Sequence, residues 1–90
     1  MIETRIQVVN RLGLHARAAA KLAQLAARFS SDIRLGKAGE EAVDGKSIMR
    51  LMLLAAGLGS ELILRTEGTD EAAAAGAIER LFADRFGEGE

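Results

Sequence analysis

The sequence predicts an α+β fold in which a four-stranded, mainly antiparallel sheet carries three helices on one face, in the order βαββαβα. Two patterns support this prediction. Segments in which apolar and polar residues alternate, typical of half-buried strands, are interspersed with alanine- and leucine-rich segments of helical spacing. The chain of 90 residues has no repeat or linker and suffices for one compact core, so residues 1–90 are expected to form a single domain.

The first strand and the first helix follow from these periods. Residues 2–9 alternate apolar Ile2, Ile6 and Val8 with polar residues and form the first predicted strand. Residues 10–13 turn the chain into a first helix over residues 16–29, which Ser30 and the residues after it end. One face of this helix is expected to be buried, because apolar residues recur at helical spacing: Ala19, Leu22, Ala26 and Phe29.

A hairpin, a short helix, a strand and a last helix complete the pattern. Residues 33–37 and 40–43 are predicted to pair through a turn at residues 36–39. Ser47 is placed to cap a helix over residues 48–56, which ends near Gly57 or Gly59. Residues 60–66 form the fourth strand, with alternating Leu62 and Leu64, and Thr69 or Asp70 caps the final helix. That helix has Ala74, Ile78, Leu81 and Phe82 on one face, and residues 87–90 are expected to be a frayed tail.

Composition excludes several classes of protein. Without cysteine, the chain has no disulfide framework, no thiolate nucleophile and no sulfur-based metal site. Its 13 acidic and 12 basic residues are interspersed, and its only aromatic residues are three phenylalanines, so we expect no nucleic-acid partner. Neither a signal peptide nor an apolar run of about 20 residues is present, which predicts a cytoplasmic protein that does not insert into membranes.

The only histidine, His15, is predicted to lie at the start of the first helix. The first turn of a helix has unpaired N–H groups and a partial positive charge, so the backbone of Ala16 and Arg17 forms an anion site. The same field favours a neutral imidazole with a lone pair free to attack phosphorus. The Arg17 guanidinium matches phosphate oxygens, which makes His15 and Arg17 the candidate reactive pair.

Other interpretations of His15 are less well supported. A lone histidine at a helix start is commonly a surface residue with a capping role. A metal site would need further histidine or cysteine ligands, and a Ser/His/Asp triad would need an enclosed oxyanion pocket. We therefore predict no metal and no cofactor.

Two motifs raise the weight of the phosphate interpretation. The sequence Gly13-Leu14-His15-Ala16-Arg17, followed about 30 residues later by Gly45-Lys46-Ser47-Ile48-Met49, resembles the HPr family of phosphocarriers of the phosphoenolpyruvate-dependent phosphotransferase system, including its nitrogen-branch relatives. The resemblance covers essentially the whole chain. It implies an open-faced β-sandwich in which His15 is phosphorylated through Nδ1, with Arg17 as its partner. Ala18 stands where the family commonly has proline, a change that keeps the helix and adds one backbone donor.

The resemblance also implies partners. Enzyme I, charged from phosphoenolpyruvate, would phosphorylate His15, and an EIIA-type protein would accept the group. Such a chain is a stoichiometric carrier rather than an enzyme, and we expect it to be a monomer.

The second motif suggests regulation rather than nucleotide binding. Gly45-Lys46-Ser47 is similar to the end of a P-loop, but Glu40 occupies the position of its first glycine. By resemblance, Ser47 is the target of an HPr kinase/phosphorylase in many bacteria, in addition to its role as a cap.

An apolar patch for partners is expected beside this serine. The helix after Ser47 is apolar nearly all round, so part of it must be exposed, and methionines adapt to several partner shapes. By resemblance the patch lies next to His15 and consists of Ile48, Met49 and Met52, flanked by Ala20 and Gln24 on the first helix.

Two alternatives remain at this stage. The chain could be a regulatory binding module of the nitrogen-branch type, in which partners read the phosphorylation state of His15 or Ser47 without sugar transport. It could also be a purely structural interaction domain that uses the methionine patch.

Overall fold

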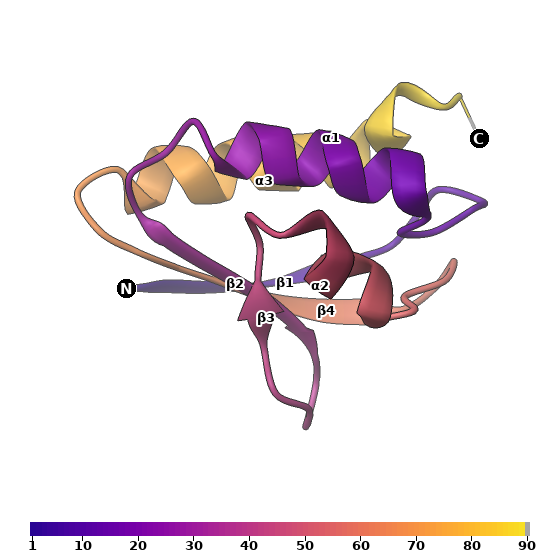
Figure 1. Ribbon diagram of the computed structural model, residues 1–90, viewed down its shortest axis with the longest axis horizontal. Helices are drawn as coiled ribbons and strands as arrows, with labels where there is room; N and C mark the ends of the chain where they lie inside the picture. The colour runs from indigo at the N-terminus through magenta and orange to yellow at the C-terminus, as the bar shows by residue number, and fades with distance from the viewer. Residues whose placement is uncertain (90) are drawn as a thin grey trace.

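A four-stranded antiparallel sheet carries the helices on one face in the computed structural model, which describes residues 1–89 (Figure 1). The strands are β1 (Ile2–Gln7), β2 (Asp32–Lys37), β3 (Val43–Asp44) and β4 (Glu61–Glu67), in the spatial order β1-β4-β2-β3. Every pair of neighbours is antiparallel, so the predicted fold class is confirmed.

The two faces of the sheet differ as the alternation predicts. Leu62 and Leu64 of β4 point into the core and are fully buried, beside Ile6 of β1 and Leu35 of β2 in the register. The opposite face is charged and exposed, with surface ion pairs such as the one from Arg65 Nε to Glu3 Oε1 at 2.8 Å. Such exposed pairs each contribute less than about 1 kcal/mol to stability. The sheet therefore has one open face.

Three helices and a short 3-10 turn lie between and after the strands. They are α1 (Ala16–Ala26), α2 (Ile48–Leu53), α3 (Glu71–Ala83) and η1 (Arg85–Gly87). Both α1 and α3 lie over the sheet, while α2 packs against α1 near β3 (Figure 1). The core face of α1 consists mainly of small side chains, which allow close packing: Ala18, Ala19, Leu22, Ala23 and Ala26.

Several predicted boundaries were wrong. The first helix ends at Ala26 rather than at residue 29. After Ala26 the hydrogen bonds span three residues instead of four, as from the Phe29 N–H to the Ala26 carbonyl oxygen, so the α-helix gives way to a tighter turn. The second helix ends at Leu53 rather than at residue 56, because Ala55 adopts a positive φ of 51° and turns the chain back. The third strand is Val43–Asp44 rather than residues 40–43, although the predicted hairpin with β2 is present.

The cap of α3 also differs from the expectation. Asp70 occupies the N-cap position, but its carboxylate makes no capping hydrogen bond. It instead accepts hydrogen bonds from the backbone N–H groups of Ser30 and Ser31, at 2.9 Å each, and from the Ser31 hydroxyl. Asp70 thus joins the start of α3 to the turn that precedes β2.

The C-terminal segment is not a frayed tail as far as residue 88. Phe86 is almost fully buried, and its ring meets that of Phe82 edge-on with a centroid distance of 4.9 Å. Lys21 Nζ on α1 donates to the carbonyl oxygen of Phe86 at 2.6 Å. Residues 84–88 therefore fold back toward the N-terminal end of α1.

Candidate functional site

A tightly packed turn places His15 at the N-terminus of α1. Gly13 has a φ of +67°, and a Cβ at this position would lie 2.4 Å from the carbonyl oxygen of Ala56. The Leu14 N–H donates to that same oxygen at 2.8 Å. The segment after α2 thus supports the turn directly, and His15 follows with an extended backbone (ψ 177°) as the N-cap of α1.

The two ring nitrogens of His15 face different groups. Nδ1 accepts a hydrogen bond from the backbone N–H of Arg17 at 3.3 Å, which confirms the predicted position at the helix start. Nε2 contacts the carboxylate oxygen Oε2 of Glu88. The His15 side chain is 27% exposed, so the ring remains accessible from solvent.

Glu88 is held between His15 and a buried amide. Asn10 Nδ2 donates to Glu88 Oε1 at 3.0 Å and to the carbonyl oxygen of Gly13 at 2.8 Å. Burial raises the pKa of the Glu88 carboxyl, whereas the hydrogen bonds donated by His15 and Asn10 lower it. With a further contribution from the positive charge of Lys21, the pKa lies below its usual value, which favours the carboxylate.

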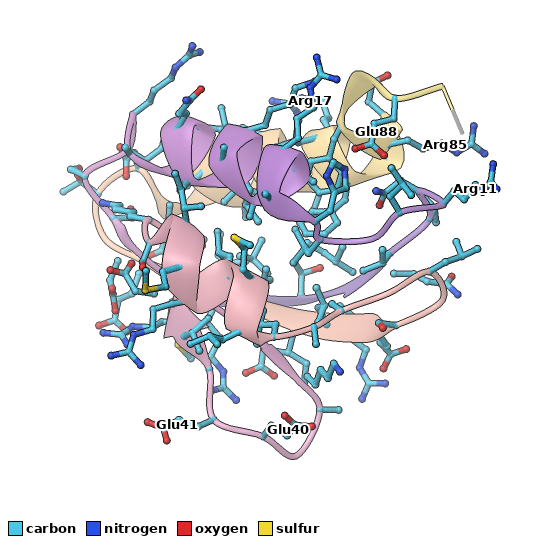
Figure 2. The ribbon with its side chains drawn as sticks, turned by 45° about the vertical axis from the view of Figure 1, so that its right-hand side comes forward. Arg11, Arg17, Glu40, Glu41, Arg85 and Glu88 are labelled. Atoms are coloured by element: carbon cyan, nitrogen blue, oxygen red, sulfur yellow. The ribbon has the colours of Figure 1, made fainter. Side chains whose placement is uncertain are left out.

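Positive side chains gather beside this ring. An open cavity of about 540 Å³ is lined by Arg11, Leu12, Arg17, Lys21, Gly87 and Glu88. Figure 2 shows Arg17 and Glu88 at the same end of the molecule, far from Glu40 and Glu41 in the β2–β3 hairpin. Three cations around one cavity, next to the N-terminus of a helix, favour an anion such as a phosphoryl group.

The predicted regulatory residue and the predicted patch lie on α2 and α1. Ser47 Oγ accepts from the Arg50 N–H at 3.2 Å, which confirms Ser47 as the N-cap of α2. The apolar side chains expected at the surface are exposed there: Ile48, Met49 and Met52, with Leu53 in addition. On α1, Ala16 and Gln24 are exposed and Ala20 is half-buried.

The two motifs do not meet at one point. The end of α2 leads to Ala56, which contacts the turn before His15, whereas Ser47 begins α2. A six-residue helix rises by about 9 Å, so this length of helix separates Ser47 from the end that approaches His15. The patch on α2 therefore spans the distance between the two motifs.

Residues 1–89 contain no cluster of three or more histidine, cysteine, aspartate or glutamate side chains arranged to hold a metal ion. None of the helices in the described chain is long and apolar enough to cross a membrane.

Sequence reasoning missed Asn10 and Glu88. The expectation of a frayed tail over residues 87–90 gives Glu88 no role. Phe86, a large apolar residue four positions after Phe82, is a signal that the chain continues along the core. Asn10 directly follows the first predicted strand, and its position in the sequence indicates only a turn. The contact between Glu88 and His15 spans 73 positions, so no local pattern predicts it.

Comparisons with known proteins agree with this architecture. Residues 2–84 match the family model described as PTS HPr component phosphorylation site. Among curated proteins, the chain is similar to phosphocarrier protein HPr of Cupriavidus necator, with 51% identity over all of both chains. It is also similar to that of Pseudomonas aeruginosa, with 52% identity over 94% of each. Among solved structures, HPr-C-His from Thermoanaerobacter tengcongensis superimposes with a TM-score of 0.92 at 42% identity, over 98% of both chains.

Proposed function

Because this chain belongs to the HPr family of phosphocarriers of the phosphoenolpyruvate-dependent phosphotransferase system, we propose that His15 carries its phosphoryl group. One observation carries this assignment. The Nδ1 atom of His15 lies at the N-terminus of α1, beside the first-turn N–H groups and the cationic cavity that Arg17 lines.

The transfer follows from this geometry. The lone pair of Nδ1 attacks the phosphorus of the phosphorylated donor and forms a new N–P bond. The bond between phosphorus and the donor breaks, and its electron pair stays on the donor. Charge on the phosphoryl oxygens is met by the N–H groups of Ala16 and Arg17 and by the Arg17 guanidinium. The hydrogen bond from the Arg17 N–H to Nδ1 is long, at 3.3 Å, and therefore weak. Once Nδ1 is bonded to phosphorus, this N–H can donate to a phosphoryl oxygen instead.

The donor is Enzyme I and the acceptor an EIIA-type protein under this proposal. Both would cover the exposed apolar residues Ile48, Met49 and Met52, with Ala20 and Gln24 at the flank. The chain then acts as a stoichiometric carrier rather than as an enzyme. It works in the cytoplasm, where phosphoenolpyruvate is available, and as a monomer, because both partners need the same open surface.

Ser47 serves as a regulatory site in this proposal, modified by an HPr kinase/phosphorylase. Ser47 is half-buried at the start of α2 and directly precedes Ile48 of the docking surface. A phosphate there would add about two negative charges to a surface that must be desolvated on docking.

The test is labelling by Enzyme I and isotopically labelled phosphoenolpyruvate. The wild type should take up one phosphate that is lost in acid and stable in base, as a phosphoramidate is, and His15→Ala should take up none. Arg17→Ala should slow transfer by about tenfold or more, because a charge-assisted contact to the phosphoryl group is removed.

Arg28→Ala is the matched control, because this exposed arginine lies just beyond the other end of α1. It should transfer at the wild-type rate. An acid-stable adduct, or normal labelling of His15→Ala, would contradict the assignment of His15.

A further inference from the structure

We propose that Glu88, held in place by Asn10, is a positioning residue for the transfer reaction. It fixes the proton of His15 on Nε2, which leaves the lone pair on Nδ1, and it stabilises the positive charge that the ring acquires during transfer. This inference rests on His15 being the phosphoryl acceptor.

Two independent contacts select the same form of the ring. An ionised carboxylate only accepts hydrogen bonds, so the nitrogen that faces Glu88, Nε2, must carry a proton. A backbone N–H only donates, so the nitrogen that faces Arg17, Nδ1, must present its lone pair. The neutral ring is therefore held as the tautomer whose nucleophile points to the N-terminus of α1.

The buried amide of Asn10 explains why the carboxylate is fixed. Asn10 is fully buried, and both of its neighbours, Gly13 O and Glu88 Oε1, are acceptors, so its NH₂ group must face them. Its Oδ1 has no hydrogen-bond partner within residues 1–89. Leaving a buried oxygen unpaired costs about 1–3 kcal/mol. The cost of the unpaired oxygen is offset by the two hydrogen bonds of the amide, which hold Glu88 against the turn that carries His15.

The segment that delivers Glu88 is also anchored. Phe86 is buried against Phe82, and Lys21 on α1 binds the Phe86 carbonyl, two residues before Glu88. The other charged groups that line the same cavity, Arg11, Arg17 and Lys21, are all positive. Of these, Lys21 is one of the causes that lower the pKa of the Glu88 carboxyl and so favour its ionised form.

The charge balance of the transfer gives the carboxylate a role in the reaction. When Nδ1 bonds to phosphorus, the ring keeps its Nε2 proton and becomes positively charged. Glu88 Oε2 is already placed against that proton and either neutralises the ring or takes the proton from it. When the phosphoryl group leaves for the acceptor, the N–P bond breaks and its electron pair returns to Nδ1. Nε2 keeps its proton, or recovers it from Glu88, so the neutral tautomer is restored. The contact is strongest when the ring is charged, so it should speed the phosphorylation of Nδ1 by the donor.

The experiment compares Glu88→Gln with wild type in two measurements. In the first, the ¹⁵N signals of the two ring nitrogens of unphosphorylated His15 report which one carries the proton. Wild type should show a protonated Nε2, and Glu88→Gln a mixture of tautomers, since an amide can donate to Nε2 as well as accept from it. In the second, the rate of Enzyme I-dependent labelling should fall by about tenfold or more in Glu88→Gln.

Two further variants separate this role from other effects. Glu79→Gln removes the same charge from an exposed position on α3 and should change neither measurement. Asn10→Ala should shift the ring signals in the same direction as Glu88→Gln, and a melting curve shows whether it is folded. If it is not folded, Glu88→Gln decides alone.

The failure of this inference differs from the failure of the proposed function. Unchanged ring signals in Glu88→Gln, with or without a loss of rate, would overturn the positioning role. A wild-type protein that shows the expected tautomer but takes up no phosphate from Enzyme I would instead overturn the assignment of His15.

Discussion

Gly13 shows at the scale of one residue how the site depends on close contact between backbones. Its positive φ is a conformation that residues with a Cβ adopt at a cost of about 1–2 kcal/mol. The added carbon would also meet the Ala56 oxygen at 2.4 Å and the Gly57 Cα at 2.8 Å. Both neighbours are main-chain atoms, so they cannot rotate away as a side chain could.

We expect Gly13→Ala to lower the free energy of unfolding by clearly more than Gly39→Ala, which serves as the control. Gly39 also has a positive φ, of 82°, but no atom lies within 4 Å of its added carbon, so only the conformational strain applies there. The excess should be about 1–3 kcal/mol, because the Leu14–Ala56 hydrogen bond must be displaced. Urea unfolding of both variants measures it, and equal losses would show that the turn relaxes freely.

At the scale of an element, α2 combines a cap with an exposed apolar surface. The Ser47 hydroxyl satisfies one N–H at its start, and only Leu51 among its six residues is buried. A helix this short is marginal by itself, so its stability depends on this cap and on packing against α1. A change at Ser47 can therefore act on folding, on docking or on both.

Two substitutions at Ser47 separate these effects. Ser47→Asp keeps a good N-cap and adds a negative charge beside Ile48, so Enzyme I-dependent labelling should slow with little change in melting temperature. Ser47→Ala removes the cap without adding charge, so it should lower stability by about 1 kcal/mol and leave labelling near the wild-type rate. Melting curves and labelling rates of both variants are the measurements. If Ser47→Asp labels normally, Ser47 is only a cap.

For the molecule as a whole, the sequence predicts the parts of the fold that local patterns determine. The alternation around Leu62 and Leu64 predicts β4 and its buried face, and the residues before each apolar run predict the caps at His15 and Ser47. Helix ends were less predictable, because Ala55 has a positive φ that its residue type does not announce. Of the two partners of His15, only Arg17 is predictable, because it is a neighbour in the sequence. Glu88 is distant in the sequence and is brought to His15 by the packing of Phe86 against Phe82.

Asp70 makes a second contact between distant parts of the sequence, which joins the start of α3 to the turn before β2. Its carboxylate accepts from the Ser31 hydroxyl and from the N–H groups of Ser30 and Ser31, across 39 or 40 positions of sequence. The hydrogen bond from the Ser31 hydroxyl is the largest of the causes that lower the pKa of Asp70 to about 2. The ionised side chain thus ties the start of α3 to the turn between α1 and β2.

The folded state should therefore become less stable in acid, because Asp70 is protonated there. The pKa of this carboxyl is about 2 in the folded chain and 3.8 ordinarily, so the unfolded chain binds a proton first as the pH falls. The contribution is fully present above about pH 4, and it is lost as the pH falls through about 2. We expect Asp70→Asn to be less stable than wild type near neutral pH, with a gap that narrows between pH 4 and pH 2.

Asp32→Asn is the control, because Asp32 is an exposed neighbour whose side chain meets only Arg34 among the contacts of residues 1–89. Its stability should stay parallel to that of wild type over the same range of pH. Urea unfolding at a series of pH values measures all three proteins. A gap between wild type and Asp70→Asn that is the same at pH 2 as at pH 6 would mean that the shape of the Asp70 side chain, and not its charge, holds α3 to the turn before β2.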